Sequence, residues 1–354
     1  MTEKKTAAVI MAGGRGERLR PITDTMPKPA VEVGGKPALG YALSMIKEAG
    51  LRSAIVTVQY RYEDIRDRFG DTYDGVTIDY YIEDEPLGTA GSVRAAVHER
   101  FYDDSFEELI VLSGDAVCDF DLRPALSAHR NSGADATLLL AESSEPWKYG
   151  CVTLDSTKQH GRIVDFIEKP RDMRGTALVN TGIYILSRET VDRIPKREYD
   201  FGRDLFPLMI KEGARLNGFV ADGYWCDIGS PESYRRASFD AAKNKIRGVS
   251  ASVSPTGAVV SADCRAGMGS TLSGCVLGHG VTVGVDVHAT DSVLCRDVTV
   301  GDGVVIGSGS VIGEGAFIST GTVIDAGSMI GAGEEVFTKA PASRPSQREL
   351  PLRQ

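Results

Sequence analysis

The sequence lacks the features that mark exported, membrane-spanning and nucleic-acid-binding proteins. Its six cysteines form no C-x-x-C pair and its five histidines no ligand-like cluster, so we expect neither a disulfide framework nor a zinc site but a reduced, cytoplasmic chain. No eighteen consecutive residues are apolar, and the apolar stretch before the first glycines is too short for a signal-peptide core. The formal net charge of −9 argues against nucleic acid or an anionic membrane as a partner, because both attract basic surfaces.

The length of 354 residues leaves room for two domains, since single cores stop growing near about 250 to 300 residues. The composition changes after Arg247, where helix formers give way to glycine, valine, serine and threonine. We therefore predict an α/β Rossmann-like domain over residues 1–245, a second domain over 246–338 and a loose C-terminal tail over 339–354.

In the first domain, apolar runs that are typical of strands alternate with helical patterns, which predicts an α/β sheet covered on both faces. The predicted strands are Ala7–Met11, Ser53–Val58, Ile78–Ile82, Leu109–Leu112, Ala136–Ala141 and Asn180–Leu186. The predicted helices are Pro37–Ala49, Tyr62–Phe69, Gly91–Arg100, Leu122–Ser132, Arg203–Glu212 and Pro231–Lys245. Ligands of such sheets bind beyond the C-terminal strand ends, so residues that directly follow a strand are the first candidates for a site.

The second domain carries a six-residue repeat. Aliphatic residues recur every six positions at Leu294, Val300, Ile306, Ile312, Ile318, Ile324 and Ile330. Glycine often follows directly, and small or β-branched residues stand two positions before. Leu277 and Val283 belong to earlier copies that are out of phase. This periodicity predicts a β-helix of four or five coils.

The segment Ala7–Pro29 indicates a polyphosphate site. A short apolar run ends in Gly13, Gly14 and Gly16, where main-chain amides can surround phosphate oxygens. Two cations, Arg18 and Lys28, follow. No P-loop motif occurs, and the dinucleotide fingerprint requires a helix where prolines keep this chain extended. We therefore expect a nucleoside triphosphate at this loop.

Two aspartates are candidate magnesium ligands. Asp115 follows a predicted strand directly, beside a glycine, and Asp227 lies in the segment YWCDIG. Mg²⁺ on nucleotides is commonly held by one or two carboxylates, with phosphates and water as the other ligands. Each aspartate alone also fits a helix cap or a turn, and we expect Asp119 and Asp121 to have such structural roles.

Seven motifs together resemble the sugar-1-phosphate nucleotidylyltransferases, and the resemblance extends to the end of the repeats. The motifs are GGxGxRLxPxT from Gly13, PKP from Pro27, EPLGTAG from Glu85, SGD from Ser113, EKP from Glu168, NTGIY from Asn180 and WxDIG from Trp225. The family implies a Rossmann-like nucleotidyltransferase domain, often followed by a left-handed parallel β-helix of hexapeptide repeats. It also implies transfer of a nucleotidyl group from a nucleoside triphosphate to a sugar 1-phosphate, with release of pyrophosphate.

The resemblance further implies the roles of individual residues. Arg18 and Lys28 would hold the triphosphate, Asp115 and Asp227 would bind Mg²⁺, and Lys169 would contact the sugar phosphate. Arg18, Lys28 and Asp115 are the catalytic candidates. The remaining acceptor-binding candidates are Gly150, Glu168, Asn180 and Thr181. The nucleotide-binding candidates are Ala12, Gly13, Gly14, Gly16, Glu83, Pro86, Gly88 and Thr89.

The nucleobase is predicted from Glu83. Guanine presents two adjacent donors, which an ionised carboxylate accepts bidentately, whereas thymine and uracil suit an amide better. The thymidylyl branch commonly has glutamine at the position of Glu83 and asparagine at that of Ala116. GTP is therefore the expected donor, and EPLGTAG and SGDAVCDF also resemble mannose-1-phosphate guanylyltransferases. A solvated acidic residue at a strand end is the alternative reading of Glu83.

Other functions remain open at this stage. A thymidylyl- or adenylyltransferase that uses glucose 1-phosphate is one, and a regulatory subunit that binds nucleotide sugar without turnover is another. A β-helix that acetylates a sugar through His279 or His288 is the third, although the coils are few. The acceptor is expected to be a hexose 1-phosphate or a cyclitol phosphate, and the exposed faces of the β-helix favour a homo-oligomer.

Overall fold

The computed structural model describes residues 5–100, 106–261 and 263–337. The predicted tail over 339–354 lies outside the described residues. The chain divides into two compact units, between Ala251 and Ser252, and each is described by itself. Among the described residues, no helix combines the length and apolar character needed to cross a bilayer.

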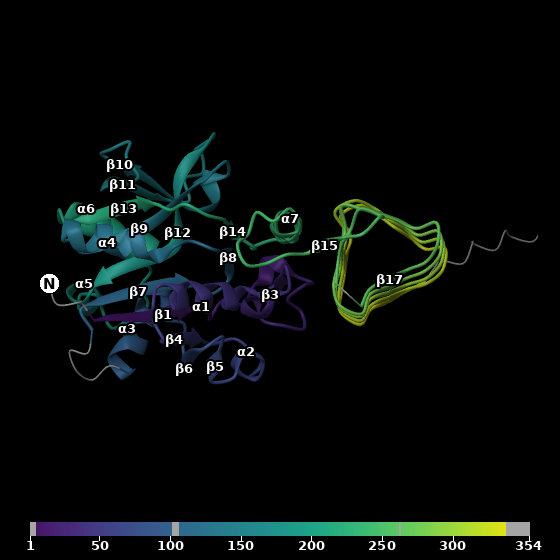
Figure 1. Ribbon diagram of the computed structural model, residues 1–354, viewed down its shortest axis with the longest axis horizontal. Helices are drawn as coiled ribbons and strands as arrows, with labels where there is room; N and C mark the ends of the chain where they lie inside the picture. Colours follow the sequence, from purple (N-terminus) through teal and green to yellow (C-terminus); the bar gives the residue numbers. More distant parts are fainter. Residues whose placement is uncertain (1–4, 101–105, 262, 338–354) are drawn as a thin grey trace, which may run out of the picture. The chain divides into compact units, whose positions relative to one another are not determined.

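The first unit is built on a ten-stranded mixed sheet with the order β10-β11-β13-β9-β12-β7-β1-β4-β6-β5 (Figure 1). Its strands are β1 (Thr6–Met11), β4 (Ser53–Val58), β5 (Thr72–Tyr73), β6 (Val76–Ile82), β7 (Glu108–Ser113), β9 (Ala136–Ser143), β10 (Gly150–Leu154), β11 (His160–Glu168), β12 (Ala177–Ser187) and β13 (Leu216–Val220). Strands β6, β4, β1 and β7 run parallel, as in the nucleotide-binding half of a Rossmann fold. Strand β12 runs antiparallel to both β7 and β9.

Helices cover both faces of this sheet, as the sequence predicts. The helices are α1 (Ala38–Glu48), α2 (Tyr62–Phe69), α3 (Gly88–Arg100), α4 (Leu122–Ser132), α5 (Arg188–Asp192), α6 (Phe206–Lys211) and α7 (Pro231–Ala242). Successive strand residues point to opposite faces. Ile10 of β1 accordingly belongs to the core beneath α1 and α4, whereas its neighbour Val9 belongs to the core beneath α3 and α6.

The ends of four helices differ from the sequence-based expectation. Helix α1 is one residue shorter at each end, and α7 ends at Ala242 rather than at Lys245. Helix α3 begins at Gly88 rather than Gly91. The expected helix over Arg203–Glu212 begins earlier, as a π-helical turn at Phe201–Leu205 that continues into α6. A separate two-stranded ribbon pairs β8 (Ala116–Cys118) with β14 (Trp225–Asp227). Strand β14 of this ribbon carries Asp227, one of the two predicted magnesium ligands.

The second unit is a parallel β-helix with a triangular cross-section, seen end-on in Figure 1. Three sheets, with the strand orders β15-β16-β19-β22-β25-β28, β17-β20-β23-β26-β29 and β18-β21-β24-β27, form its faces. Their strands are β15 (Ser252–Val253), β16 (Val259–Val260), β17 (Arg265–Ala266), β18 (Thr271–Ser273), β19 (Val276–Leu277), β20 (Thr282–Val283), β21 (His288–Thr290), β22 (Val293–Leu294), β23 (Thr299–Val300), β24 (Val305–Ile306), β25 (Val311–Ile312), β26 (Phe317–Ile318), β27 (Val323–Ile324), β28 (Met329–Ile330) and β29 (Glu335–Val336).

The hexapeptide aliphatics stack inside this β-helix. Leu277, Leu294, Ile312 and Ile330 occupy successive rungs of one face, and the first three are buried. The early copies at Leu277 and Val283 are out of phase with the later ones in sequence, because their coil is one residue shorter. In space they are in register, since Leu277 pairs with Leu294 and Val283 with Val300. The β-helix that the repeats predict is confirmed.

Candidate active site

A cavity of about 230 Å³ lies where β7, β12 and the β8-β14 ribbon meet in the first unit. It is lined by Arg18, Lys28, Ser113, Asp115, Ala116, Lys148, Tyr149, Gly150, Glu168, Lys169, Asn180, Thr181, Gly182, Trp225 and Asp227. Every residue predicted for catalysis, acceptor binding or metal binding lies in this lining. A larger cavity of about 430 Å³ in the same unit is lined by none of the predicted residues.

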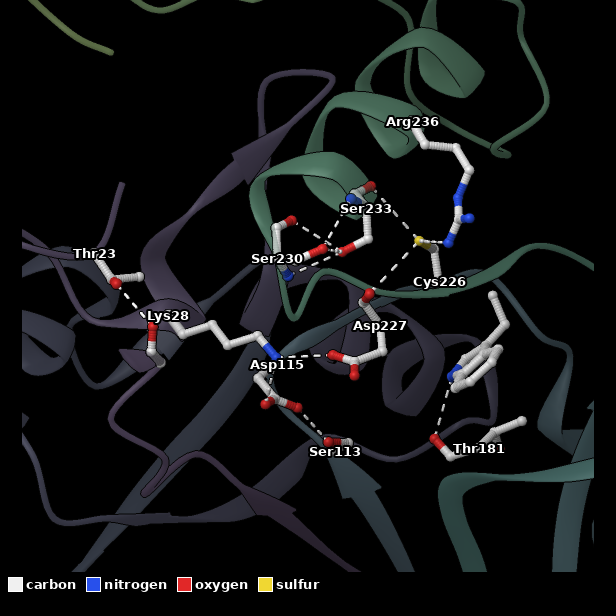
Figure 2. Close-up of polar contacts among 12 residues, drawn as sticks. Thr23, Lys28, Ser113, Asp115, Thr181, Cys226, Asp227, Ser230, Ser233 and Arg236 are labelled. Carbon is white, nitrogen blue, oxygen red and sulfur yellow. Dashed lines mark hydrogen bonds and ion pairs between the residues drawn. The ribbon is translucent and has the colours of Figure 1, made fainter. Parts of the chain in front are cut away.

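Lys28 joins the two predicted metal ligands (Figure 2). Its Nζ lies 2.9 Å from Asp115 Oδ2 and 2.9 Å from Asp227 Oδ1, and the residue is only 5% exposed. Burial by itself would lower the pKa of the ammonium, but the charges and hydrogen bonds of the two carboxylates outweigh it and raise the pKa above its usual range. A buried, fully charged lysine is thus held at the base of the cavity.

Asp115 lies at the C-terminal end of β7, as the sequence predicts, in the two-residue turn that joins β7 to β8. Ser113 Oγ donates a hydrogen bond to Asp115 Oδ1, which leaves Oδ2 for Lys28. Burial opposes ionisation, yet the attraction of Lys28 and the hydrogen bond from Ser113 keep the pKa of this carboxyl below its usual value. Asp115 is therefore an anionic oxygen donor at the end of a central strand.

Asp227 is positioned by β14 and by the cap of α7. It pairs with Ala116 in the β8-β14 ribbon, and α7 starts four residues later. At that start, Ser230 and Ser233 form a capping box, visible in Figure 2, in which each side chain bonds the other's backbone N–H. The segment between ribbon and helix is thereby fixed at both ends, and Asp227 is fixed within it.

The segment after the glycine loop contains no α-helix, as its prolines predict, but it is not extended: it folds into 3₁₀ turns at Glu17–Leu19 and Lys28–Ala30. Gly16 has φ +68, and a Cβ there would lie 3.0 Å from the Cβ of Lys28. Thr23 Oγ1 donates to the Gly16 carbonyl at 2.9 Å. Gly16 therefore allows the loop to fold back onto Lys28.

The other loop residues leave space at its outer side. A Cβ at Gly14 would have no neighbour within 4 Å, and one at Gly13 would lie 3.6 Å from Glu83 Oε1. Ala12 donates its N–H to Thr57 of β4 at 2.9 Å, which anchors the start of the loop. The predicted nucleotide-binding residues thus lie outside the cavity lining, with the loop and Glu83 beside each other.

The segment from Glu83 to Thr89 is anchored at both ends. The Glu83 carboxylate accepts a hydrogen bond from Ser92 Oγ of α3, and burial raises the pKa of this carboxyl. The N–H and Oγ1 of Thr89 both contact Asp200 Oδ1, at 3.2 and 3.0 Å. Pro86 lies between these anchors, and Gly88 adopts φ +70 against the backbone of Tyr199.

Glu168 and Lys169, at the end of β11, also line the cavity. A Cβ on Gly150 would lie 2.9 Å from Glu168 Oε2, and one on Gly202 would lie 2.6 Å from the same oxygen. A side chain at either position would therefore crowd the Glu168 carboxylate in its present position. Lys169 Nζ lies 3.4 Å from Glu168 Oε1, and its side chain is 66% exposed, so this ammonium is accessible from the cavity.

The polar side chains of Asn180 and Thr181 are bonded within the protein. Asn180 accepts from Gly182 N at 3.0 Å and donates to Tyr184 Oη at 2.9 Å. Thr181 Oγ1 donates to the carbonyl of Leu139 at 2.7 Å. These two residues therefore shape the irregular part of β12 that borders the cavity.

Lys148, Tyr149 and Trp225 are three of the lining residues that were not predicted as site residues from the sequence. Trp225 donates its indole N–H to the Thr181 carbonyl at 3.2 Å, and its ring packs edge-on against Tyr149 with centroids 5.0 Å apart. Lys148 forms a 2.6 Å ion pair with Glu145. Each of the three lies within two residues of a predicted site residue, and this proximity in sequence is the only signal that could have indicated them.

The expected structural roles of two further aspartates are confirmed. Asp121 caps α4 by accepting from Arg123 N. Asp119 accepts from the N–H groups of Tyr224 and Arg247 at 2.6 and 2.7 Å. None of the six cysteines, each within the described ranges, forms a disulfide.

A Rossmann-like sheet with a cavity at its strand ends that is lined by lysines, an arginine and carboxylates defines an enzyme that acts on phosphorylated substrates. The nucleotidyl transferase family model matches residues 7–244. The chain therefore belongs to the sugar-1-phosphate nucleotidyltransferase family, as its motifs predict.

Curated relatives and a solved structure support this membership. A mannose-1-phosphate guanylyltransferase of Mycobacterium tuberculosis is 34% identical over 308 residues, which cover 80% of this chain and 82% of the relative. A probable mannose-1-phosphate guanylyltransferase 3 of Oryza sativa is 34% identical over 64% of this chain and 62% of its own length. The crystal structure of HddC from Yersinia pseudotuberculosis, complexed with GMP-PN, aligns with a TM-score of 0.55 and 29% identity over 66% of this chain and 98% of HddC.

Proposed function

We propose that this enzyme transfers a guanylyl group from GTP to a hexose 1-phosphate, with mannose 1-phosphate as the leading acceptor, and releases pyrophosphate. The observation that carries the proposal is that one cavity is lined by Lys28, Asp115 and Asp227 together with Glu168 and Lys169. The curated relatives named above are mannose-1-phosphate guanylyltransferases, which supports the choice of both substrates. A cyclitol phosphate is the alternative acceptor.

The proposed chemistry requires no protein nucleophile. A phosphate oxygen of the acceptor attacks the α-phosphorus of the triphosphate, the bond to the β-phosphate breaks, and pyrophosphate leaves. Both reactants are anions, so the residues act by aligning them and by neutralising the charge that develops. Lys169 orients the acceptor phosphate, while Arg18 and Lys28 hold the triphosphate and stabilise the leaving group.

A Mg²⁺ ion fits the donors that are present. Asp115 and Asp227 supply hard carboxylate oxygens, and their side chains retain 32% and 25% exposure. Among the described residues, no group of three or more His, Cys, Asp or Glu side chains forms a ready cage. Two carboxylates match a magnesium ion whose other ligands are phosphates and water. When bound, the ion would neutralise phosphate charge, and Asp115 and Asp227 would hold it.

Base selection is assigned to Glu83, whose carboxylate would accept from the two adjacent guanine donors. The rival functions are a thymidylyl- or adenylyltransferase that uses glucose 1-phosphate and a regulatory subunit without turnover. The cationic set of Arg18, Lys28 and Lys169 favours a working enzyme over a regulatory subunit, since binding without turnover does not require it.

The β-helix is proposed to support a homo-oligomer in a reduced, cytoplasmic compartment. Its outer faces carry exposed apolar side chains, with Val323 68% and Met329 55% exposed, and such patches favour association. Light scattering of the purified chain tests the assembly, because a monomeric mass at micromolar concentration would contradict it.

The decisive experiment is an activity matrix of four nucleoside triphosphates against several sugar 1-phosphates, with pyrophosphate release as the readout. We expect the highest kcat/KM for GTP with mannose 1-phosphate. Transfer from dTTP or ATP to glucose 1-phosphate would replace the proposed substrates. The absence of pyrophosphate from every combination would favour the regulatory subunit.

A further inference from the structure

The most informative feature of the site is the position of one ammonium between two carboxylates. We propose that Lys28 occupies, in the free protein, the place between Asp115 and Asp227 that the divalent ion needs, so that metal enters only together with the triphosphate. The inference rests on the metal-dependent transfer proposed above. It adds an order of events and makes Lys28 a competitor of the ion as well as a ligand of the phosphates.

The Lys28 ammonium occupies one carboxylate oxygen of each aspartate. Asp115 Oδ1 is bonded by Ser113, so Oδ2 is the oxygen that faces Lys28. Asp227 Oδ1 faces the same ammonium. A magnesium ion demands carboxylate oxygens at about 2.0 to 2.1 Å. An ion held by these two oxygens would take the place that the ammonium occupies.

The charges of the site disfavour binding of the divalent ion while the Lys28 ammonium is still in place. Two carboxylates and one ammonium leave a single negative charge in a site that is mostly shielded from water. Adding a divalent cation beside the ammonium would bring like charges together in a medium that screens them weakly. A triphosphate removes this conflict, because its oxygens accept the displaced ammonium. Metal and nucleotide are thereby expected to bind with positive coupling.

Lys28 is built to move only at its far end. Its backbone lies in a short 3₁₀ turn, and its Cβ is so close to Gly16 that a Cβ added there would lie 3.0 Å away. Beyond Cβ, the flexible four-carbon stem allows the ammonium to change partners. The exchange therefore requires a rotation of one side chain and no rearrangement of the sheet.

The test measures Mn²⁺ binding to the full chain without nucleotide, by the electron paramagnetic resonance signal of the free ion. Lys28→Ala is compared with the wild type, and Lys28→Met provides a variant of closer volume in case the alanine protein does not fold. Lys169→Ala is the matched control, since it removes a cavity lysine that pairs with Glu168 and not with the two aspartates.

We expect the Lys28 variants to bind Mn²⁺ about 10- to 100-fold more tightly than the wild type, because a competent state populated at a few per cent lowers apparent affinity by that fraction. Lys169→Ala should match the wild type. Adding Asp227→Asn to Lys28→Met should abolish the gain, which assigns the bound ion to this site.

Equal Mn²⁺ affinity in the wild type and the Lys28 variants would overturn the inference. A second arm repeats the titration with a GTP analogue whose α,β-bridging oxygen is replaced by methylene, with protein-bound Mn²⁺ counted by equilibrium dialysis. Retention of metal in that arm, despite equal affinities in the first, would leave the proposed function standing. The absence of Mn²⁺ from every variant in both arms would overturn the metal-dependent function as well.

Discussion

The indole N–H of Trp225 bonds to the carbonyl of Thr181 at 3.2 Å, and this contact ties the β8-β14 ribbon to the irregular part of β12. The two elements form adjacent walls of the cavity. This is the hydrogen bond that the Trp225 side chain adds to its ring contact with Tyr149 and to the pairing of Trp225 with Cys118 in the ribbon.

Trp225→Phe removes this donor while it keeps an aromatic ring. We expect kcat/KM for the acceptor to fall about 3- to 10-fold, which corresponds to the loss of one ordinary hydrogen bond, and KM for GTP to stay unchanged. Steady-state kinetics with each substrate varied in turn measures the effect. Trp147→Phe is the control, because Trp147 is 38% exposed and lies outside the cavity lining. An equal loss in both variants would contradict a local role for Trp225.

Lys28→Ala should reduce turnover by about a hundredfold or more, on the order of 3 kcal/mol, which is the cost of losing one preorganised charge contact to a developing anion. Pyrophosphate release under saturating substrates is the measurement. Lys47→Ala provides the comparison, since Lys47 pairs with Asp74 at an exposed position. Wild-type turnover in Lys28→Ala would show that the lysine is not part of the catalytic machinery.

Glu83→Gln tests base selection. Replacing the carboxylate with an amide removes one of two acceptors for guanine, so we expect the preference for GTP over dTTP and UTP to fall about 10- to 100-fold, in line with one bidentate contact. The four-triphosphate assay reports it. Ser92→Ala is the companion variant, because it removes the internal partner of Glu83 and leaves the carboxylate. An unchanged GTP preference in Glu83→Gln would exclude Glu83 from base reading.

Gly307→Ala should destabilise the β-helix by about 1 to 3 kcal/mol through overpacking, because the added Cβ would lie 2.4 Å from the backbone N of Ala326 in the next coil. Gly331 is the matched control. A Cβ there would meet only Glu334 Oε2, at 3.4 Å, so Gly331→Ala should be tolerated.

Circular dichroism during heating follows both units, whereas tryptophan fluorescence follows only the first, which contains both tryptophans. We expect an earlier loss of the dichroism signal in Gly307→Ala with unchanged fluorescence. Identical melting of the two alanine variants would contradict the packing argument.

The sequence predicts the central strands well, because parallel strands buried on both faces appear as continuous apolar runs. Strand β4 and helices α2 and α4 begin and end where expected. Strand β11 was missed, since only Ile163 and Phe166 of its nine residues are buried, and its pattern is that of an exposed element. Strand β13 was missed because Gly218 interrupts its apolar run.

The motifs predict most residues of the cavity lining, but they do not predict the ion pairs of Lys28 with Asp115 and Asp227. Lys28 is 87 residues from Asp115 and 199 from Asp227, and nothing in the local pattern of these residues indicates that they touch. A lysine after a proline and an aspartate after a strand are each compatible with separate roles. Their union depends on the topology that brings β7 and the β8-β14 ribbon together.

The reversal of strand direction at β12 has a consequence for how such an enzyme diversifies. The residues proposed for donor recognition lie in loops that follow the parallel strands β1 and β6, whereas those proposed for acceptor binding lie on or next to β10, β11 and β12, on the other side of β7. The two recognition surfaces are carried by separate blocks of the sheet that share only the charged centre. Mutations that retune one substrate can accumulate in its own block, so the choice of base and the choice of sugar are free to evolve independently.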